Sequence, residues 1–131
     1  MSDATSWIRI NRIPATDIGP TVWHSTAQTN ADVIVFDRYY DDYCGLAWDS
    51  GVLGLATCRS ITATNRCDQA NVRYNNTFTS NWTATYHRSL ACHEVGHAIG
   101  LKHREDQCME TVGLTRTGYS AHDVAHINAE F

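Results

Sequence analysis

The feature that most constrains this sequence is the segment from Trp82 to Leu101, which contains no proline and suits an α-helix. At about 100° per residue, Leu90, His93 and His97 fall on one side of this helix. Apolar residues lie on most of its other sides, a pattern typical of a helix that is buried in a core. Two histidines on one face of a buried helix therefore need a chemical reason to be there.

The two histidines belong to a known metal-binding pattern. His93 and His97 enclose the letters H-E-x-x-H, so both rings can reach one ion from the same face. Glu94 lies at the rim of that face, better placed to contact the water on an ion than the ion itself. Gly100 permits the φ > 0 conformation that ends a helix, and this turn allows His103 to swing back as a third ligand. Three neutral nitrogen ligands plus water match a catalytic zinc site, which keeps one coordination position open.

Together with Met109, these residues resemble the signature of the metzincin metallopeptidases, H-E-x-x-H-x-x-G-x-x-H followed by a turn that contains methionine. The resemblance implies that Met109 packs beneath the metal site without binding the ion. Within that clan the chain looks most like the matrixins, through weaker similarity of three segments and the final helix. Those segments are 31–36, 51–56 and 70–74. The resemblance implies an α+β fold: a twisted mixed sheet with a helix before it, a buried zinc-binding helix, a Met-turn and a C-terminal packing helix.

Hydrophobic patterns predict the elements of the N-terminal part. Residues 7–12 alternate apolar and polar side chains and predict a strand. Residues 17–28 predict a short helix with proline near its first turn. Its buried side would consist of Val22, Trp23 and Ala27.

Further along the chain, apolar and β-branched residues predict strands at 32–36, 51–58 and 70–74. A packing helix is predicted from Ser120 to Phe131, where Ser120 and Asp123 have the spacing of a capping box. The sequence has no repeat or linker, and its length suits one domain, so residues 1–131 are predicted to form a single catalytic domain.

Five cysteines suggest disulfides. Cys92 precedes the first ligand and Cys108 precedes Met109, so a bridge between them would tie the helix to the turn that supports the site. Two buried thiols, or two further ligands, are the alternatives. Cys58 can pair with Cys67 across the loop between them, or with Cys44.

Composition excludes several classes of partner. Ten basic against fourteen acidic residues give a net charge of −4, and no cluster of cations suits nucleic acid. No apolar stretch approaches the roughly 20 residues of a membrane span. The first residues lack the features of a secretory signal, but five cysteines are unusual in a cytosolic protein. We therefore expect a secreted, monomeric protein in a mature form.

Other site residues follow from the resemblance. An extended substrate would pair with an edge strand, which assigns Gly54, Leu55 and Ala56 to substrate binding. Tyr119 follows the methionine, where some metzincins place a tyrosine against zinc or the oxyanion, but packing is the favoured role here. One zinc ion is expected, because no histidine lies between Val33 and Tyr86 to hold a structural zinc. Hard oxygen ligands for calcium could come from Asp32, Asp37, Asp41, Asp42 and Asp49.

These patterns predict a zinc-dependent endopeptidase that hydrolyses peptide bonds in protein substrates. Glu94 would act as the general base toward a metal-activated water. Two alternatives share the zinc site: an interaction module that binds zinc without cleaving, and a hydrolase of a non-protein amide or ester. The retained carboxylate speaks against the first alternative, because ligation alone does not need it.

Overall fold

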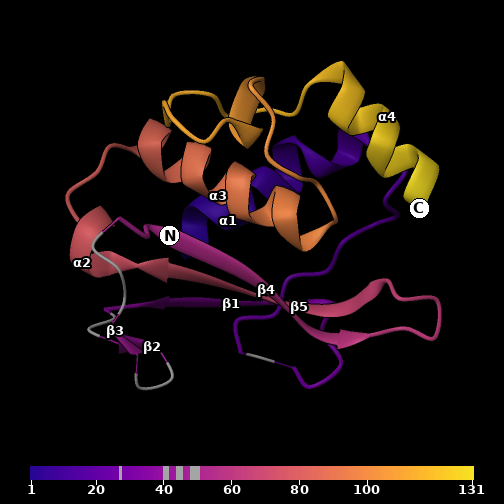
Figure 1. The fold of residues 1–131 in the computed structure, drawn as a ribbon, viewed down its shortest axis with the longest axis horizontal. Helices are drawn as coiled ribbons and strands as arrows, with labels where there is room; N and C mark the ends of the chain where they lie inside the picture. Colours follow the sequence, from indigo (N-terminus) through magenta and orange to yellow (C-terminus); the bar gives the residue numbers. More distant parts are fainter. Residues whose placement is uncertain (27, 40–41, 44–45, 48–50) are drawn as a thin grey trace.

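The computed structural model describes residues 1–26, 28–39, 42–43, 46–47 and 51–131. Its elements form two layers, with the main helices above one face of a β-sheet in the view of Figure 1. The sheet has the strand order β1-β5-β4, where β1 is Val33–Arg38, β5 is Cys67–Asn75 and β4 is Gly54–Ile61. Strand β1 runs parallel to β5 and β4 runs antiparallel to it, so the sheet is mixed, as predicted. Strand β4 lies at an edge of this sheet.

Strands β2 and β3 and the helices complete the fold within the described residues. The helices are α1 (Ser2–Asn11), α2 (Asn76–Thr79), α3 (Ala84–Ala98) and α4 (Ala121–Glu130), with 3-10 turns at Ile13–Ala15 and Gln107–Met109. The two-residue strands β2 (Asp42–Tyr43) and β3 (Leu46–Ala47) pair with each other. The combination agrees with the α+β class that the sequence predicts, but the helix that precedes the sheet is α1 and not the one predicted at residues 17–28.

The core lies between the helices and the sheet. It consists of Ile8 from α1, Leu90 and Val95 from α3, and Val72 and Tyr74 from β5, each less than a tenth exposed. Tyr74 is fully buried, and its hydroxyl group shares a hydrogen bond of 2.9 Å with Thr5 Oγ1 of α1. A phenol without such a partner would be costly to bury, so this bond fixes α1 against the central strand.

The strand predicted at residues 7–12 is wrong, because most of this segment belongs to helix α1. The alternation rested on Ile8 and Ile10, but Ile8 is fully buried whereas Ile10 is 58% exposed. The buried face instead contains Ala4 and Ile8, four residues apart, which is the spacing of a helix. Small residues on that face made the helical period hard to recognise.

The helix predicted at residues 17–28 is also wrong, because the described residues of this segment form bends and chain without regular secondary structure. Val22 is 76% exposed and Trp23 is 39% exposed, so the expected apolar face does not pack. Ala27 lies outside the described residues. Short isolated helices are marginal in water without such packing, and neither residue supplies it.

The C-terminal helix α4 begins as predicted. The Ser120 hydroxyl group accepts a hydrogen bond from the Asp123 N–H group at 3.1 Å, and the Asp123 carboxylate accepts one from the Ser120 N–H group at 3.0 Å. These reciprocal bonds confirm the capping box. Ile127 is fully buried beneath the helix, whereas Phe131 is 65% exposed.

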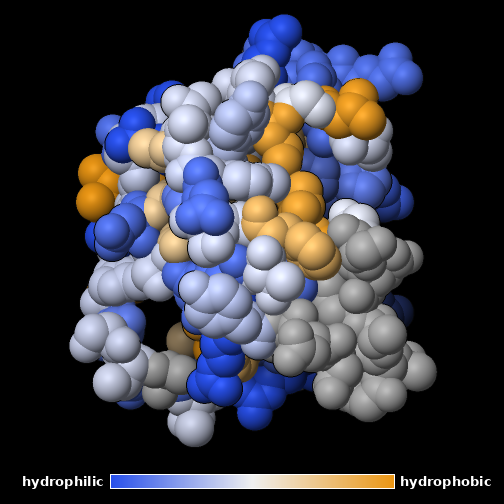
Figure 2. Space-filling model, turned by 90° about the vertical axis from the view of Figure 1, so that its left-hand side faces the viewer, coloured by the Kyte–Doolittle hydropathy of each residue, from blue (hydrophilic) through white to orange (hydrophobic). Residues whose placement is uncertain are grey.

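On the face shown in Figure 2, hydrophobic residues form a narrow central band and smaller separate spots among hydrophilic ones. Among the described residues, no helix has the length and apolar character needed to cross a membrane.

A disulfide joins Cys58 to Cys67 and closes the β4–β5 hairpin, whereas Cys44 lies outside the described residues.

Candidate metal centre

Helix α3 carries the first two histidines and ends in a turn that brings in the third. The Gly100 N–H group donates to His97 O at 3.1 Å, and the Leu101 N–H group donates to Gly96 O at 2.9 Å. This pair of bonds is a Schellman motif, which needs a left-handed residue after the helix. Gly100 supplies it with a φ of 96°. The chain then turns back, and His103 reaches the face of the helix that holds His93 and His97.

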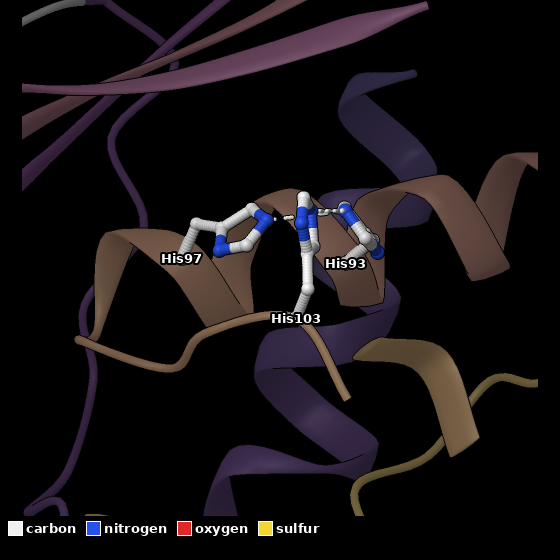
Figure 3. Close-up of side chains that lie close together, drawn as sticks. All are labelled: His93, His97 and His103. Carbon is white, nitrogen blue, oxygen red and sulfur yellow. Dashed lines mark hydrogen bonds between the residues drawn. The ribbon is translucent and has the colours of Figure 1, made fainter. Parts of the chain in front are cut away.

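The three imidazole rings converge on one point. The Nε2 atom of His93 lies 3.1 Å from Nε2 of His97 and 3.1 Å from Nε2 of His103. Figure 3 shows His103 rising from the loop between the two helical histidines, with the three ring edges turned toward one another. Among the described residues, this is the cluster of histidine, cysteine or acidic side chains suited to hold a metal ion.

The remaining ring nitrogens of the two helical histidines are anchored to the backbone. His93 Nδ1 lies 2.8 Å from Cys108 O, and His97 Nδ1 lies 2.8 Å from Leu101 O. A carbonyl oxygen only accepts hydrogen bonds, so each Nδ1 carries the hydrogen and each Nε2 of the neutral ring presents a lone pair. Metal-binding histidines are commonly oriented in this way.

Burial favours the neutral rings that a metal requires. Burial, together with the nearby rings of His97 and His103, lowers the pKa of His93 to about 4, against the opposing hydrogen bond to Cys108. Burial also lowers the pKa of His97. Neutral lone pairs that face each other at 3.1 Å do not bond to one another. Tetrahedral zinc with Zn–N distances of about 2.0–2.1 Å holds its ligand nitrogens about 3.3 Å apart, so the observed spacing fits a zinc ion.

Comparison with known families agrees with this geometry. The model of the metallo-peptidase family M12B, described as reprolysin-like, matches residues 17–104, about two thirds of the 131 residues. The chain belongs to this family. The match supports the metzincin-type metallopeptidase that the sequence predicts, but it lies in the reprolysin branch, so the likeness to matrixins is not confirmed. No curated protein and no solved structure matches the chain.

Glu94 of this metallopeptidase lies between α3 and the edge strand β4. Glu94 is only 5% exposed and its side chain contacts Gly54, and the backbone N–H group of Ala56 acts as a donor that lowers the pKa of its carboxyl group. Burial raises the pKa of Glu94 to about 8, although the bond from Ala56 opposes this shift. A divalent cation nearby would favour the carboxylate, since an opposite charge stabilises the ionised form.

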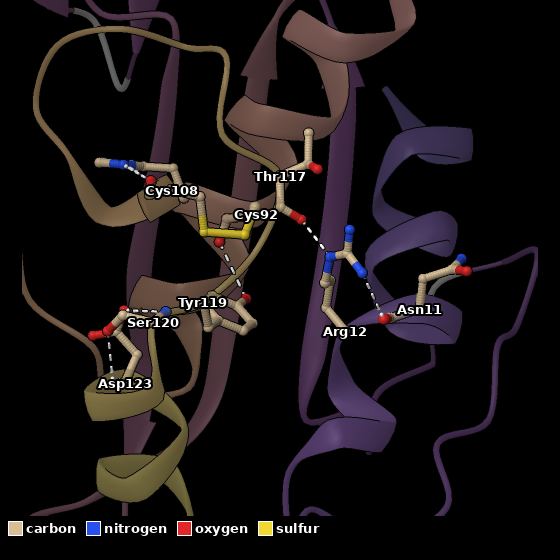
Figure 4. Close-up of a disulfide and its surroundings, with 9 residues drawn as sticks. Asn11, Arg12, Cys92, Cys108, Thr117, Tyr119, Ser120 and Asp123 are labelled. Carbon is tan, nitrogen blue, oxygen red and sulfur yellow. Dashed lines mark hydrogen bonds between the residues drawn. A yellow bond between two sulfur atoms is a disulfide. The ribbon is translucent and has the colours of Figure 1, made fainter. Parts of the chain in front are cut away.

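Met109 and Tyr119 lie on the other side of the helix, at Gly96. Met109 is fully buried, and a Cβ atom at Gly96 would come within van der Waals distance of both side chains. The Tyr119 hydroxyl group donates to Cys92 O at 3.1 Å (Figure 4). Burial raises the pKa of Tyr119, so the hydroxyl group keeps the proton it donates. The contact is one of packing, and a role of Tyr119 toward the substrate stays a prediction.

A disulfide connects the helix to the turn that holds Met109. It joins Cys92 to Cys108, which are 16 residues apart (Figure 4). Cys92 is adjacent to His93, and the Cys108 carbonyl group orients the His93 ring. The disulfide therefore holds together the two segments that form the hydrogen bond between His93 Nδ1 and Cys108 O. Sequence spacing suggested the pairing, but nothing in the sequence showed that Cys108 O or Leu101 O would support the ligands.

Calcium stays a prediction. Asp41 and Asp49 lie outside the described residues, and the side chain of Asp42 is not among those described. The Asp37 carboxylate instead pairs with the ammonium group of Met1 at 2.6 Å.

Proposed function

We propose that this metallopeptidase is a zinc-dependent endopeptidase in which His93, His97 and His103 hold one zinc ion. The proposal rests on the Nε2 atom of His93, which lies 3.1 Å from the Nε2 atoms of both His97 and His103, and on the two Nδ1 atoms that carbonyl groups fix. An ordinary buried histidine needs only one satisfied ring nitrogen and no neighbouring rings. Two anchored rings that turn their lone pairs toward one point form a site for a cation.

Glu94 is the proposed general base. A zinc ion bound at this site would make a water acidic enough to be deprotonated near neutral pH and would polarise the scissile carbonyl group. Glu94 would accept the proton from that water and then deliver it to the leaving nitrogen. Its position beside the ligand His93 and its near-complete burial keep bulk water from competing for the proton.

The edge strand β4 is the proposed platform for the substrate. Among the described strands, β4 pairs with β5 on one side, which leaves its outer edge facing the Glu94 side chain. An extended peptide could add to this edge at Gly54, Leu55 and Ala56 through main-chain hydrogen bonds. Such binding selects flexible or unfolded segments of protein substrates. The two disulfides fit an oxidising, extracellular location.

The test compares two variants of the zinc-loaded protein in a casein digestion with and without chelator. We expect Glu94→Ala to keep zinc and to lose about 10²–10⁴-fold of turnover, the usual contribution of a general base. His97→Ala should lose both zinc and turnover. Glu94→Gln, which preserves the side-chain shape and an acceptor for Ala56, should behave like Glu94→Ala and so separates basicity from packing.

The same assay judges the alternatives. Chelator-sensitive cleavage of casein supports the endopeptidase. Bound zinc without cleavage of casein would favour the interaction module, and hydrolysis of small amides or esters alone would favour the non-peptide hydrolase. Equal loss of zinc in Glu94→Ala and His97→Ala would contradict the assignment of Glu94 as the base.

A further inference from the structure

We propose that Gly54 is a positioning residue that sets where the Glu94 carboxylate lies. The inference rests on the proposed role of Glu94 as the general base. It assigns to strand β4 the function of positioning that carboxylate. Substrate pairing alone does not require glycine at this position, because main-chain hydrogen bonds can form with any residue except proline.

The close approach of β4 to Glu94 is the first observation. A Cβ atom at Gly54 would lie 2.6 Å from Glu94 Oε1, 2.8 Å from Glu94 Cγ and 2.9 Å from Glu94 Cδ. Carbon and oxygen atoms that are not hydrogen-bonded do not approach this closely. Glycine therefore provides the space that the carboxylate occupies, and a side chain at position 54 would compete for it.

The backbone of Ala56, two residues along the same strand, supports this placement. Residues 54 and 56 are two apart on one strand, so their N–H groups point to the same edge of the sheet. The Ala56 backbone lowers the pKa of Glu94, as a donor toward the carboxylate does, and the missing side chain of Gly54 leaves room for that carboxylate. Strand β4 thus positions the Glu94 carboxylate in two ways: Ala56 offers a backbone donor, and Gly54 leaves the space that the carboxylate occupies.

These contacts predict what an added methyl group would do. Restoring an ordinary contact of 3.4 Å requires the Glu94 carboxylate to move by about 0.8 Å, since the Cβ atom would start 2.6 Å away. The atoms in the way belong to a flexible side chain, so the fold and the histidines need not move. A misplacement of about 1 Å at a reacting group can cost about 10²-fold in rate. We therefore expect Gly54→Ala to lower kcat by about that factor with zinc content unchanged.

The experiment measures kcat, KM and zinc content for the wild type, Gly54→Ala and Gly19→Ala with one peptide substrate. Gly19 is the matched control, because a Cβ atom there would meet nothing within 4 Å and its φ is not positive. A fall in kcat with an unchanged KM in Gly54→Ala alone supports the proposal. A raised KM with unchanged kcat would overturn it, since Gly54 would then act on the substrate directly.

A second arm uses a background in which the clash is absent. In Glu94→Ala, the further change Gly54→Ala should leave zinc content and melting temperature unchanged, because the side chain with which the methyl group would clash is absent. An equal further loss in this background would show a general structural effect and overturn the proposal. If Gly54→Ala alone does not fold, the double variant Gly54→Ala/Glu94→Ala should fold. A double variant that also fails to fold would overturn the proposal.

The third arm does not depend on activity. In the metal-free protein, amide hydrogen exchange at Ala56 reports whether the Glu94 carboxylate still accepts its hydrogen bond. Exchange at Ala56 should accelerate in Gly54→Ala and not in Gly19→Ala, and equal rates in both variants would overturn the proposal. This measurement separates the two hypotheses: a wild type that cleaves no peptide refutes the proposed function, whereas Ala56 exchange judges the role of Gly54 by itself.

Discussion

Replacing Gly96 by alanine should reveal how tightly Met109 supports helix α3, which carries two of the proposed zinc ligands. Gly96 lies inside α3, and a Cβ atom there would lie 2.4 Å from Met109 Sδ and 3.2 Å from Met109 Cε. A Tyr119 ring carbon would lie 3.2 Å away on the same side. Met109 is fully buried, so its sulfur has no solvent-filled space into which to move. The methyl group must therefore displace packed atoms.

Two opposing terms set the size of the effect. Alanine in place of glycine inside a helix stabilises it by about 1 kcal/mol. Forcing an additional methyl group into a packed core costs about 1–3 kcal/mol. The steric term is the larger one here, because the nearest atom is a buried sulfur at 2.4 Å. With a steric cost in the upper part of that range, about 2–3 kcal/mol, Gly96→Ala should lower the free energy of unfolding by about 1–2 kcal/mol.

A double-mutant cycle with Met109→Ala isolates this contact. Met109→Ala alone should cost about 2–5 kcal/mol through the cavity that it leaves. In that background the methyl group at position 96 enters the cavity, so Gly96→Ala should stabilise the protein by about 1 kcal/mol. The coupling between the two sites would then be about 2–3 kcal/mol. Urea unfolding of the four proteins at one fixed concentration of free zinc measures it, since bound zinc also shifts stability.

The reasoning fails if Gly96→Ala stabilises the wild type by about 1 kcal/mol, as it would at an open helical position. It also fails if the two substitutions add within about 0.5 kcal/mol, the range expected for independent sites.

Two further predictions concern the Cys92–Cys108 disulfide beside the site and the Ser120 cap of helix α4. Replacing both Cys92 and Cys108 by serine should lower the free energy of unfolding by about 3 kcal/mol and weaken zinc binding in a competition titration, because the bridge fixes the carbonyl group that orients His93. The matched removal of the Cys58–Cys67 bridge should lower stability without changing zinc affinity, and equal weakening by both would refute the link. Ser120→Ala should cost about 1 kcal/mol in urea unfolding through loss of the cap of α4, and an unchanged midpoint would contradict it.

The sequence predicted the elements whose determinants are local. Helix α3 and the strands β1 and β5 follow from continuous patterns, and the capping box of α4 is a signal four residues long. The positive φ of Gly100 follows from its place after the helix. Each of these features depends on residues that are close in the chain.

Prediction failed where tertiary contacts decide the structure. Helix α1 is stabilised by packing of Ile8 against the core and by the bond from Thr5 to Tyr74, a residue 69 positions away. The local sequence does not reveal these long-range contacts. The alternation of Ile8 and Ile10 with polar residues therefore predicted a strand. The contact of Gly54 with Glu94 was equally hidden, because it depends on how β4 lies beside α3. Sheet placement of this kind cannot be derived from one sequence.

The residues proposed to bind zinc lie close together in the chain, whereas those that place Glu94 lie far from it in the sequence. A stretch of fewer than 30 residues that begins with α3 supplies the three proposed ligands, both supporting carbonyl groups and the Cys92–Cys108 bridge. Closing loops of this size costs less entropy than joining segments that lie further apart in the chain, so the contacts among these residues are comparatively local. The hydrogen-bond donor and the space that place Glu94 come instead from β4, about 40 residues earlier. Disturbing the β4–β5 hairpin should therefore reduce turnover before it reduces zinc affinity, whereas disturbing the α3 segment should reduce both together.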